Sequence, residues 1–217
     1  LNTTCVELVD LLWEARSRVL QEELDKRFTP RVVSFDCFNR KLVMKDPVNF
    51  VGGKAQVVPE DVPVANEICE CLQALYMATQ SLGWDMMHIQ FDGHVHPTGK
   101  DMKCLVISYF RAAEIVRRVA EVGVPRKFLH PYGYGGTMPV GSKNENRRVD
   151  IALLRDLDGD GDVDSNDVAM ALWRAEKLWD KISKTADFVA AAKDPTFVGD
   201  PSKTMPIRMV APGIGLD

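Results

Sequence analysis

Apolar residues recur at helical spacing near the start of the chain, at Leu8, Leu12, Ala15 and Val19. Intervals of four and three residues place these side chains on one face, with Leu11, Leu20 and Leu24 nearby, so we predict an amphipathic helix that packs through this face. Pro30 marks the end of the helical segment. Two strands are predicted next, over residues 31–37 and 41–44, and they can pair as a hairpin.

The middle of the chain alternates between helical and strand patterns. These patterns predict a helix over 59–82, a strand over 86–92, a helix over 105–122, a short strand at 128–130, a glycine-rich loop over 132–143 and a strand over 147–154. Counted from the strand at 41–44, the β-α-β-α-β-β order predicts an α/β fold, an α+β sandwich with helices packed on one face of a small sheet.

A third pattern occupies the C-terminal part of the chain. A heptad-like seam within residues 166–193 is formed by Val168, Leu172, Ala175, Trp179, Ile182, Ala186 and Val189. We expect one helix that packs on its own domain, for example against the N-terminal helix; docking to another chain is the alternative. Residues 195–217 are rich in proline and glycine without any period, which predicts an extended tail, with a neighbouring subunit as its partner.

Composition and charge narrow the functional classes. Hydrophobic residues make up 46% and charged residues 27%, which is typical of a globular protein. The net charge of -4 gives no basic excess, so we expect no nucleic-acid partner. No apolar run approaches the roughly 18 residues that cross a bilayer, and five cysteines do not suggest a disulfide framework. The nucleotide, esterase and metalloprotease motifs are absent, so we predict that the protein is not an enzyme.

Six aspartates fall within one twelve-residue segment, at Asp156, Asp158, Asp160, Asp162, Asp164 and Asp167. This spacing, with Gly161 at the sixth position, is typical of an EF-hand loop, so we predict that it binds one Ca²⁺. Position twelve is Asp167 rather than glutamate, a strand rather than a helix precedes the loop, and only one loop is present. The segment is therefore similar to a single dockerin-type calcium loop. We expect a clip that fixes the next helix; a degenerate, solvated turn is the alternative.

Four segments in the middle of the chain resemble, in order, the motifs of OmpA-like domains. Residues 50–60 are similar to the entry to the family's first helix, 93–94 to the start of its G-H-T-D turn, 108–112 to its L-S-x-x-R-A helix start, and 133–151 to its C-terminal signature ending in N-R-R-V-E-I. The resemblance covers residues 42–153 and implies an OmpA-like fold for that part.

OmpA-like domains hold peptidoglycan non-covalently by its diaminopimelate group, and the resemblance implies where this chain would do so. Arg111 stands at the position of the arginine that grips the ligand carboxylate. His96 stands where the family has the aspartate that pairs with the ligand ammonium, and histidine offers no fixed negative charge. The resemblance also places Asn146, Arg147 and Arg148 at ligand-binding positions; for the two arginines, a structural role near the sheet edge is the alternative.

The two histidines of the turn, His94 and His96, also have the spacing of a metal-binding pair. On an extended segment their side chains alternate in direction, and the resemblance makes His94 a structural turn residue. We therefore favour the structural interpretation over the metal pair.

The missing aspartate leads to our prediction of function. We expect a non-catalytic structural or accessory subunit, an OmpA-like domain repurposed for protein–protein assembly, which carries a calcium-binding loop. The alternative is a non-covalent peptidoglycan anchor in the periplasm of a bacterium. The first interpretation favours a complex in a eukaryotic organelle, a mitochondrion or a plastid.

The chain accordingly divides into four segments. Residues 1–41 form an N-terminal helix and hairpin strand, 42–153 the OmpA-like domain, 154–194 the calcium loop with its helix, and 195–217 the extended tail.

Overall fold

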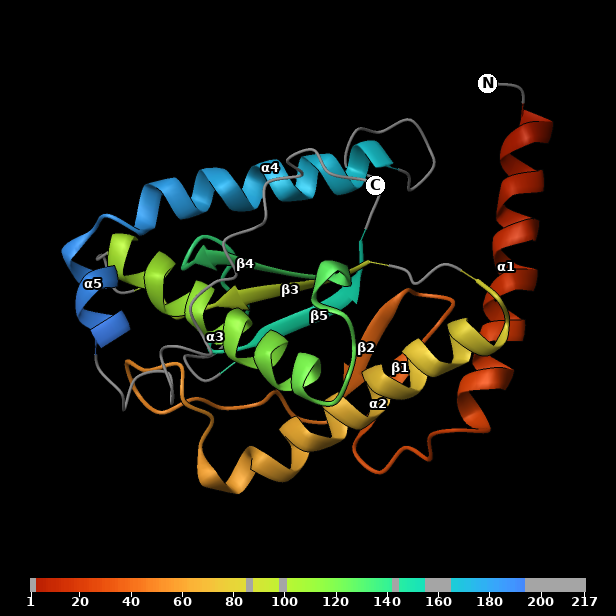
Figure 1. Ribbon diagram of the computed structural model, residues 1–217, viewed down its shortest axis with the longest axis horizontal. Coiled ribbons are helices and arrows are strands. Elements are labelled where there is room, and N and C mark those ends of the chain that lie inside the picture. Colours follow the sequence, from red (N-terminus) through yellow and green to blue (C-terminus); the bar gives the residue numbers. More distant parts are fainter. Residues whose placement is uncertain (1–2, 85–87, 98–100, 142–144, 155–164, 194–217) are drawn as a thin grey trace, which may run out of the picture.

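The computed structural model describes residues 3–84, 88–97, 101–141, 145–154 and 165–193. These residues form five α-helices and a five-stranded mixed sheet whose strand order is β1-β2-β5-β3-β4 (Figure 1). The mixed α/β fold class predicted from the sequence is confirmed. The helices are α1 (Thr3–Asp25), α2 (Val62–Ser81), α3 (Asp101–Glu121), α4 (Ser165–Ile182) and α5 (Ala186–Lys193). The strands are β1 (Val33–Asp36), β2 (Lys41–Met44), β3 (Ile89–His94), β4 (Leu129–Gly135) and β5 (Val149–Leu153).

The centre of the sheet follows the predicted alternation. Strand β3 pairs in parallel with β4 and antiparallel with β5, and the buried side chains of Ile89 and Phe91 lie two residues apart along it. Helices α2 and α3 pack against each other and supply much of the main hydrophobic core. Because β4 pairs with β3 along its whole length, it runs to Gly135. The glycine-rich loop predicted from residue 132 is therefore wrong for its first residues.

Helix α1 packs through a different face from the predicted one. Leu12 and Val19, which belong to the predicted face, are 64% and 43% exposed. The buried side of the helix carries Ser17, Leu20 and Leu24 instead. The helix has two apolar stripes, and the buried one is continued by Trp13, whose Nε1 lies 3.4 Å from the carbonyl oxygen of Phe38 in the β1–β2 turn. The hairpin and α2 select this stripe, because the other one faces away from both.

The C-terminal helical segment also differs from its prediction. The expected single helix is interrupted after Ile182, and the hydroxyl oxygen of Thr185 accepts a hydrogen bond from the backbone N–H of Phe188 at 3.2 Å, as an N-cap of α5 does. The buried apolar residues are Ala171, Ala175, Leu178, Ile182, Phe188 and Ala191. Only Ala175 and Ile182 belong to the predicted seam. Both helices pack with α3 rather than with α1, and α4 lies along β4 (Figure 1).

Among the described residues, no helix combines the length and the apolar character that crossing a bilayer requires. The thiols of Cys37, Cys69, Cys71 and Cys104 are buried, and none of these four residues forms a disulfide. The tail at 195–217 lies outside the described residues.

Candidate functional site

The hydroxyl of Ser108 joins α3 to the end of β4. Its Oγ accepts a hydrogen bond from the backbone N–H of Gly135 at 2.9 Å and donates one to the carbonyl oxygen of Leu105 at 2.9 Å. A Cβ atom at Gly93 would lie 1.9 Å from the carbonyl oxygen of Ser108, and one at Gly133 would lie 2.7 Å from the backbone nitrogen of Tyr109. The two glycines therefore allow α3 to seat directly on the sheet, which fixes the helix that carries Arg111.

The Arg111 side chain is buried, with only 2% of its surface exposed. Its Nε donates a hydrogen bond to the carbonyl oxygen of Lys54 at 3.0 Å, and its guanidinium carbon lies 5.0 Å from the centre of the Phe50 ring. Its Nη1 is buried and has no hydrogen-bond partner among the described residues. Burial, followed by the positive charge of Arg147, lowers the pKa of Arg111 to about 10. This guanidinium is thus a buried cation that the described part of the chain only partly satisfies.

The segment before α2 forms the wall that faces Arg111. Phe50 and Val57 form an isolated antiparallel bridge, and the backbone N–H of Val51 donates to the carbonyl oxygen of Gln56 at 2.8 Å. Gly53 turns the chain between them with a φ of +73°, a left-handed conformation that favours glycine. This tight loop presents the carbonyl group of Lys54 and the ring of Phe50 to the guanidinium.

His96 and Asn146 form the second polar pair of the site. The Nδ1 atom of His96 lies 3.4 Å from the amide nitrogen of Asn146, whose side chain is buried. The Oδ1 atom of Asn146 accepts a hydrogen bond from the backbone N–H of Val140 at 2.5 Å. Cys104 links this pair to Arg111, because its thiol lies 4.0 Å from the carbonyl oxygen of His96 and also interacts electrostatically with Arg111.

The two neighbouring arginines have different surroundings. Arg147 is half-buried, and its charge contributes to the lowered pKa of Arg111. Arg148 instead donates through Nε to both carboxylate oxygens of Asp150, at 3.0 Å each. The Nε2 atom of His94 contacts the same carboxylate at 3.2 Å. Of the predicted ligand-binding residues, Arg148 therefore has a local ion-pair partner. The two histidines of the turn have different partners, since His94 contacts Asp150 and His96 contacts Asn146.

Arg111 can receive an anion, because its Nη1 has no hydrogen-bond partner among the described residues and Arg147 adds a second positive charge close enough to lower its pKa. No carboxylate forms an ion pair with Arg111 among the described residues. A carboxylate ligand would complete the guanidinium with charge-assisted hydrogen bonds. The ammonium of a zwitterion would meet the imidazole of His96 and the amide of Asn146, neither of which carries a negative charge. The arrangement thus favours a simple anion over a zwitterion.

The predicted calcium site lies almost entirely outside the described residues, since Asp156, Asp158, Asp160, Asp162 and Asp164 all precede residue 165. Asp167 is described, in the first turn of α4, and its side chain is fully buried. A buried carboxylate at position twelve suits a residue that turns inward toward a cation. Within the described ranges, no three histidine, cysteine or acidic residues are grouped as metal ligands.

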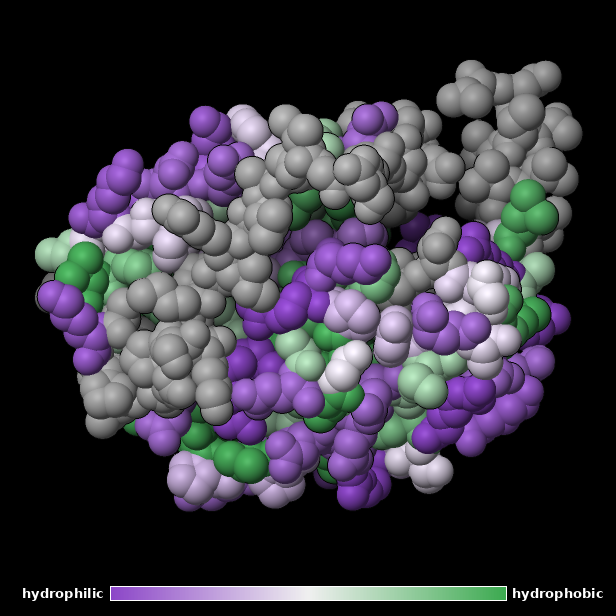
Figure 2. Space-filling model, in the orientation of Figure 1, coloured by the Kyte–Doolittle hydropathy of each residue, from purple (hydrophilic) through white to green (hydrophobic). Residues whose placement is uncertain are grey.

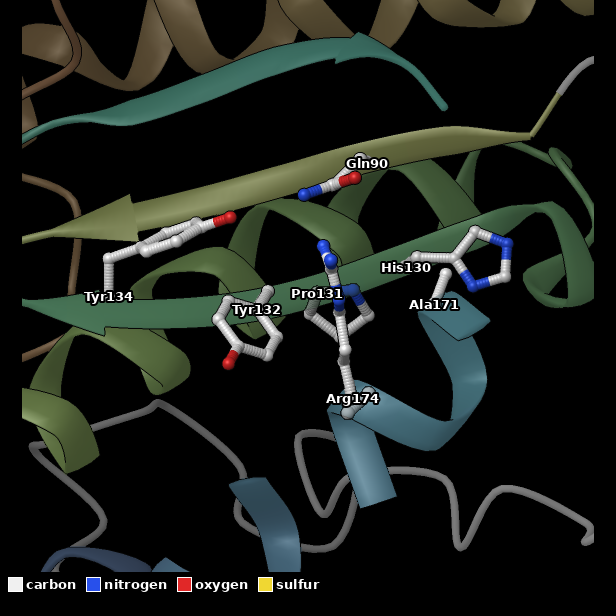
Figure 3. A pocket seen from close by; sticks show the side chains of 8 residues that line it. Gln90, His130, Pro131, Tyr132, Tyr134, Ala171 and Arg174 are labelled. Carbon is white, nitrogen blue, oxygen red and sulfur yellow. The ribbon is translucent and has the colours of Figure 1, made fainter. Parts of the chain in front are cut away.

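The sequence patterns did not reveal a second group of polar side chains. It lies on the face of the sheet opposite α2 and α3, which we call the open face. A cavity of about 210 Å³ lies between the sheet and α4, and its lining includes Gln90, His130, Tyr132, Tyr134 and Arg174 (Figure 3). The alternation of His130, Tyr132 and Tyr134 is the strand signal that could have revealed this face. It was hidden because the glycines between and after these residues suggested a loop.

A scan of the chain against protein-family models gives no match. A search among curated proteins gives no significant match either.

Proposed function

We propose that this chain is a non-catalytic subunit of a larger protein assembly, in which an OmpA-like domain serves protein–protein contact. The observation that carries this proposal is the outer stripe of α1. Leu12, Ala15 and Val19 are exposed on the face that turns away from α2 and the hairpin. Figure 1 shows the first half of α1 standing clear of the other elements, and Figure 2 shows hydrophobic surface along the described part of this helix.

The proposed occupant of the outer stripe is a helix of a neighbouring subunit. Residues at intervals of three and four on an exposed helix form a seam into which the side chains of a second helix can insert. The flank of the seam is polar, with an ion pair between Glu14 and Arg18 at 3.2 Å. A polar flank around an apolar centre is the usual organisation of a protein interface.

The acidic segment at 156–167 contributes to the same proposal as a calcium-dependent clip. Carboxylates at this spacing repel one another without a cation and wrap a single Ca²⁺ when it is present. The buried position of Asp167 at the start of α4 supports this role. Bound calcium would fix the first turn of α4 and thereby its contact with β4.

A second candidate function, a peptidoglycan anchor, is favoured by Arg111. Its buried Nη1 has no hydrogen-bond partner in the part of the chain that the structure describes, and it would suit the carboxylate of a diaminopimelate group. His96 argues against this function because it stands in place of the carboxylate that would pair with the ligand ammonium. We therefore rank assembly first.

The outer stripe can be tested on the complete chain, isolated under native conditions from the cells that produce it. A combined Leu12→Glu and Val19→Glu variant should reduce the particle size to that of the monomer, as measured by light scattering after gel filtration. Val43→Glu is the matched control, because Val43 is an apolar residue of similar exposure, 42%, on β2. An assembly that survives the double variant, or a monomeric wild-type chain, would contradict the proposal.

A further inference from the structure

We infer that the cavity between the open face of the sheet and α4 is a binding site for a small aromatic carboxylate. This site is distinct from the one around Arg111, and it does not depend on the proposed role in assembly. Its lining comes from three elements, β3, β4 and α4 (Figure 3).

The charge that selects an anion comes from Arg174. Figure 3 shows its side chain extending from α4 toward β3 and β4. Among the described residues, the guanidinium of Arg174 makes no ion pair or hydrogen bond, although Asp180 and Glu176 stand on the same helix. A planar guanidinium that extends into a cavity can bind both oxygens of a carboxylate at once.

The walls of the cavity favour a flat ring. The rings of Tyr132 and Tyr134 meet edge to face, with centroids 4.9 Å apart, and Pro131, which directly precedes Tyr132, also lines the cavity. Ala171 and Ala175 line the side that α4 contributes, and neither adds a polar group. The volume of about 210 Å³ exceeds the roughly 150 Å³ that holds a benzene-sized molecule, so a single ring with one substituent fits.

The remaining polar groups are neutral and would orient the ligand rather than compete for its charge. His130 is buried, and its Nε2 lies 2.6 Å from Nδ1 of His88. Burial lowers the pKa of His130 to about 4, so its imidazole is uncharged near neutral pH. The amide of Gln90 is held by Asp92, whose Oδ1 accepts a hydrogen bond from its Nε2 at 2.7 Å. Asp92 is not among the residues that line the cavity.

The electrostatic surroundings of Tyr134 agree with the position of Arg174. Burial is the largest cause that raises the pKa of Tyr134, and Asp92 acts in the same direction. The positive charge of Arg174 acts in the opposite direction, so the guanidinium lies close to the phenol group. The cation and the aromatic wall thus belong to the same small space.

Benzoate and its neutral analogue benzamide are suitable probes, used with the full chain and monitored by NMR shifts of backbone amides. We expect benzoate to bind with a Kd of about 1 mM or tighter and to shift the amides of β4 and α4. Benzamide should bind at least about tenfold more weakly, because it lacks the charge that pairs with Arg174.

Two variants separate the cavity from a general effect of positive charge. Arg174→Met should abolish benzoate binding while the amide spectrum stays folded. Lys177→Met is the matched control, because it removes one positive charge from the same helix at an exposed position, and it should leave binding unchanged. No benzoate binding by the wild type, equal binding of benzamide, or retained binding by Arg174→Met would each overturn the inference.

Discussion

Two of the arginines of this fold, Arg111 and Arg174, have contrasting surroundings. Arg111 is buried beside the loop at 50–57, where one carbonyl oxygen and one aromatic ring accompany it. Arg174 is half-buried on α4 and borders a cavity on the open face of the sheet. Burying the charge of Arg111 is energetically unfavourable, whereas the side chain of Arg174 keeps contact with solvent. A buried cation with so few partners indicates a function more strongly than a half-exposed one, because stability alone would not retain it.

The largest expected effect concerns the seat of α3, on which the position of Arg111 depends. Gly93→Ala places a Cβ atom 1.9 Å from the carbonyl oxygen of Ser108, so either α3 or β3 must move. We expect the free energy of unfolding in urea to fall by about 3–5 kcal/mol, or the chain not to fold. Gly52→Ala is the matched control, because no atom lies within 4 Å of the added group, and its effect should be small.

An intermediate effect on the free energy of unfolding is expected when the pH is lowered, because His130 on the open face is neutral in the folded chain. Its pKa in the folded chain, about 4, lies below the ordinary value of about 6.5, so the unfolded chain binds the proton more readily between these values. The free energy of unfolding should therefore fall as the pH falls through this range, by about 2–3 kcal/mol at pH 4.5 from His130. His88 changes in the same direction.

His130→Gln checks this pH dependence, because glutamine fills the position without a titrating group. Urea unfolding at pH 7 and pH 4.5 should show a smaller loss of stability for the variant than for the wild type. An equal loss in both proteins would show that His130 is not the neutral group on which the proposed binding site relies.

A smaller effect, an increase in the free energy of unfolding, is expected when Arg111 is replaced. Arg111→Met keeps most of the side-chain volume and removes a buried, incompletely bonded charge, while it sacrifices the hydrogen bond to Lys54. We expect the free energy of unfolding to rise by about 1–2 kcal/mol. The matched change Arg174→Met should alter it by less than about 0.5 kcal/mol. Destabilisation by Arg111→Met would mean that Arg111 serves the fold itself.

The sequence predicts the fold well where a single pattern acts on its own. The alternation of Ile89 and Phe91 identifies a strand because the residues between them are polar. Helix α1 is identified correctly, but its buried face is not, because Leu12 and Val19 form one stripe while Leu20 and Leu24 form another. Only the positions of the hairpin and α2 decide between the two stripes, and a local pattern does not contain that information.

The candidate sites differ in the same way. Arg111 and His96 are predicted because a motif resemblance names their positions, and the structure adds the contacts of Arg111 with Lys54 and Phe50. The open-face cavity is not predicted, because Arg174 reaches it from a helix far along the chain. The pairing of His130 with His88 likewise depends on the parallel pairing of β3 with β4.

The central proposal for the site around Arg111 is that it does not bind a zwitterionic peptidoglycan ligand. Co-sedimentation of the full chain with purified peptidoglycan tests it most directly. We predict that the wild type stays in the supernatant and that His96→Asp moves to the pellet, because the new carboxylate can pair with the ligand ammonium. Adding Arg111→Met to that variant should return it to the supernatant. Sedimentation of the wild type that is lost in Arg111→Met would contradict the account.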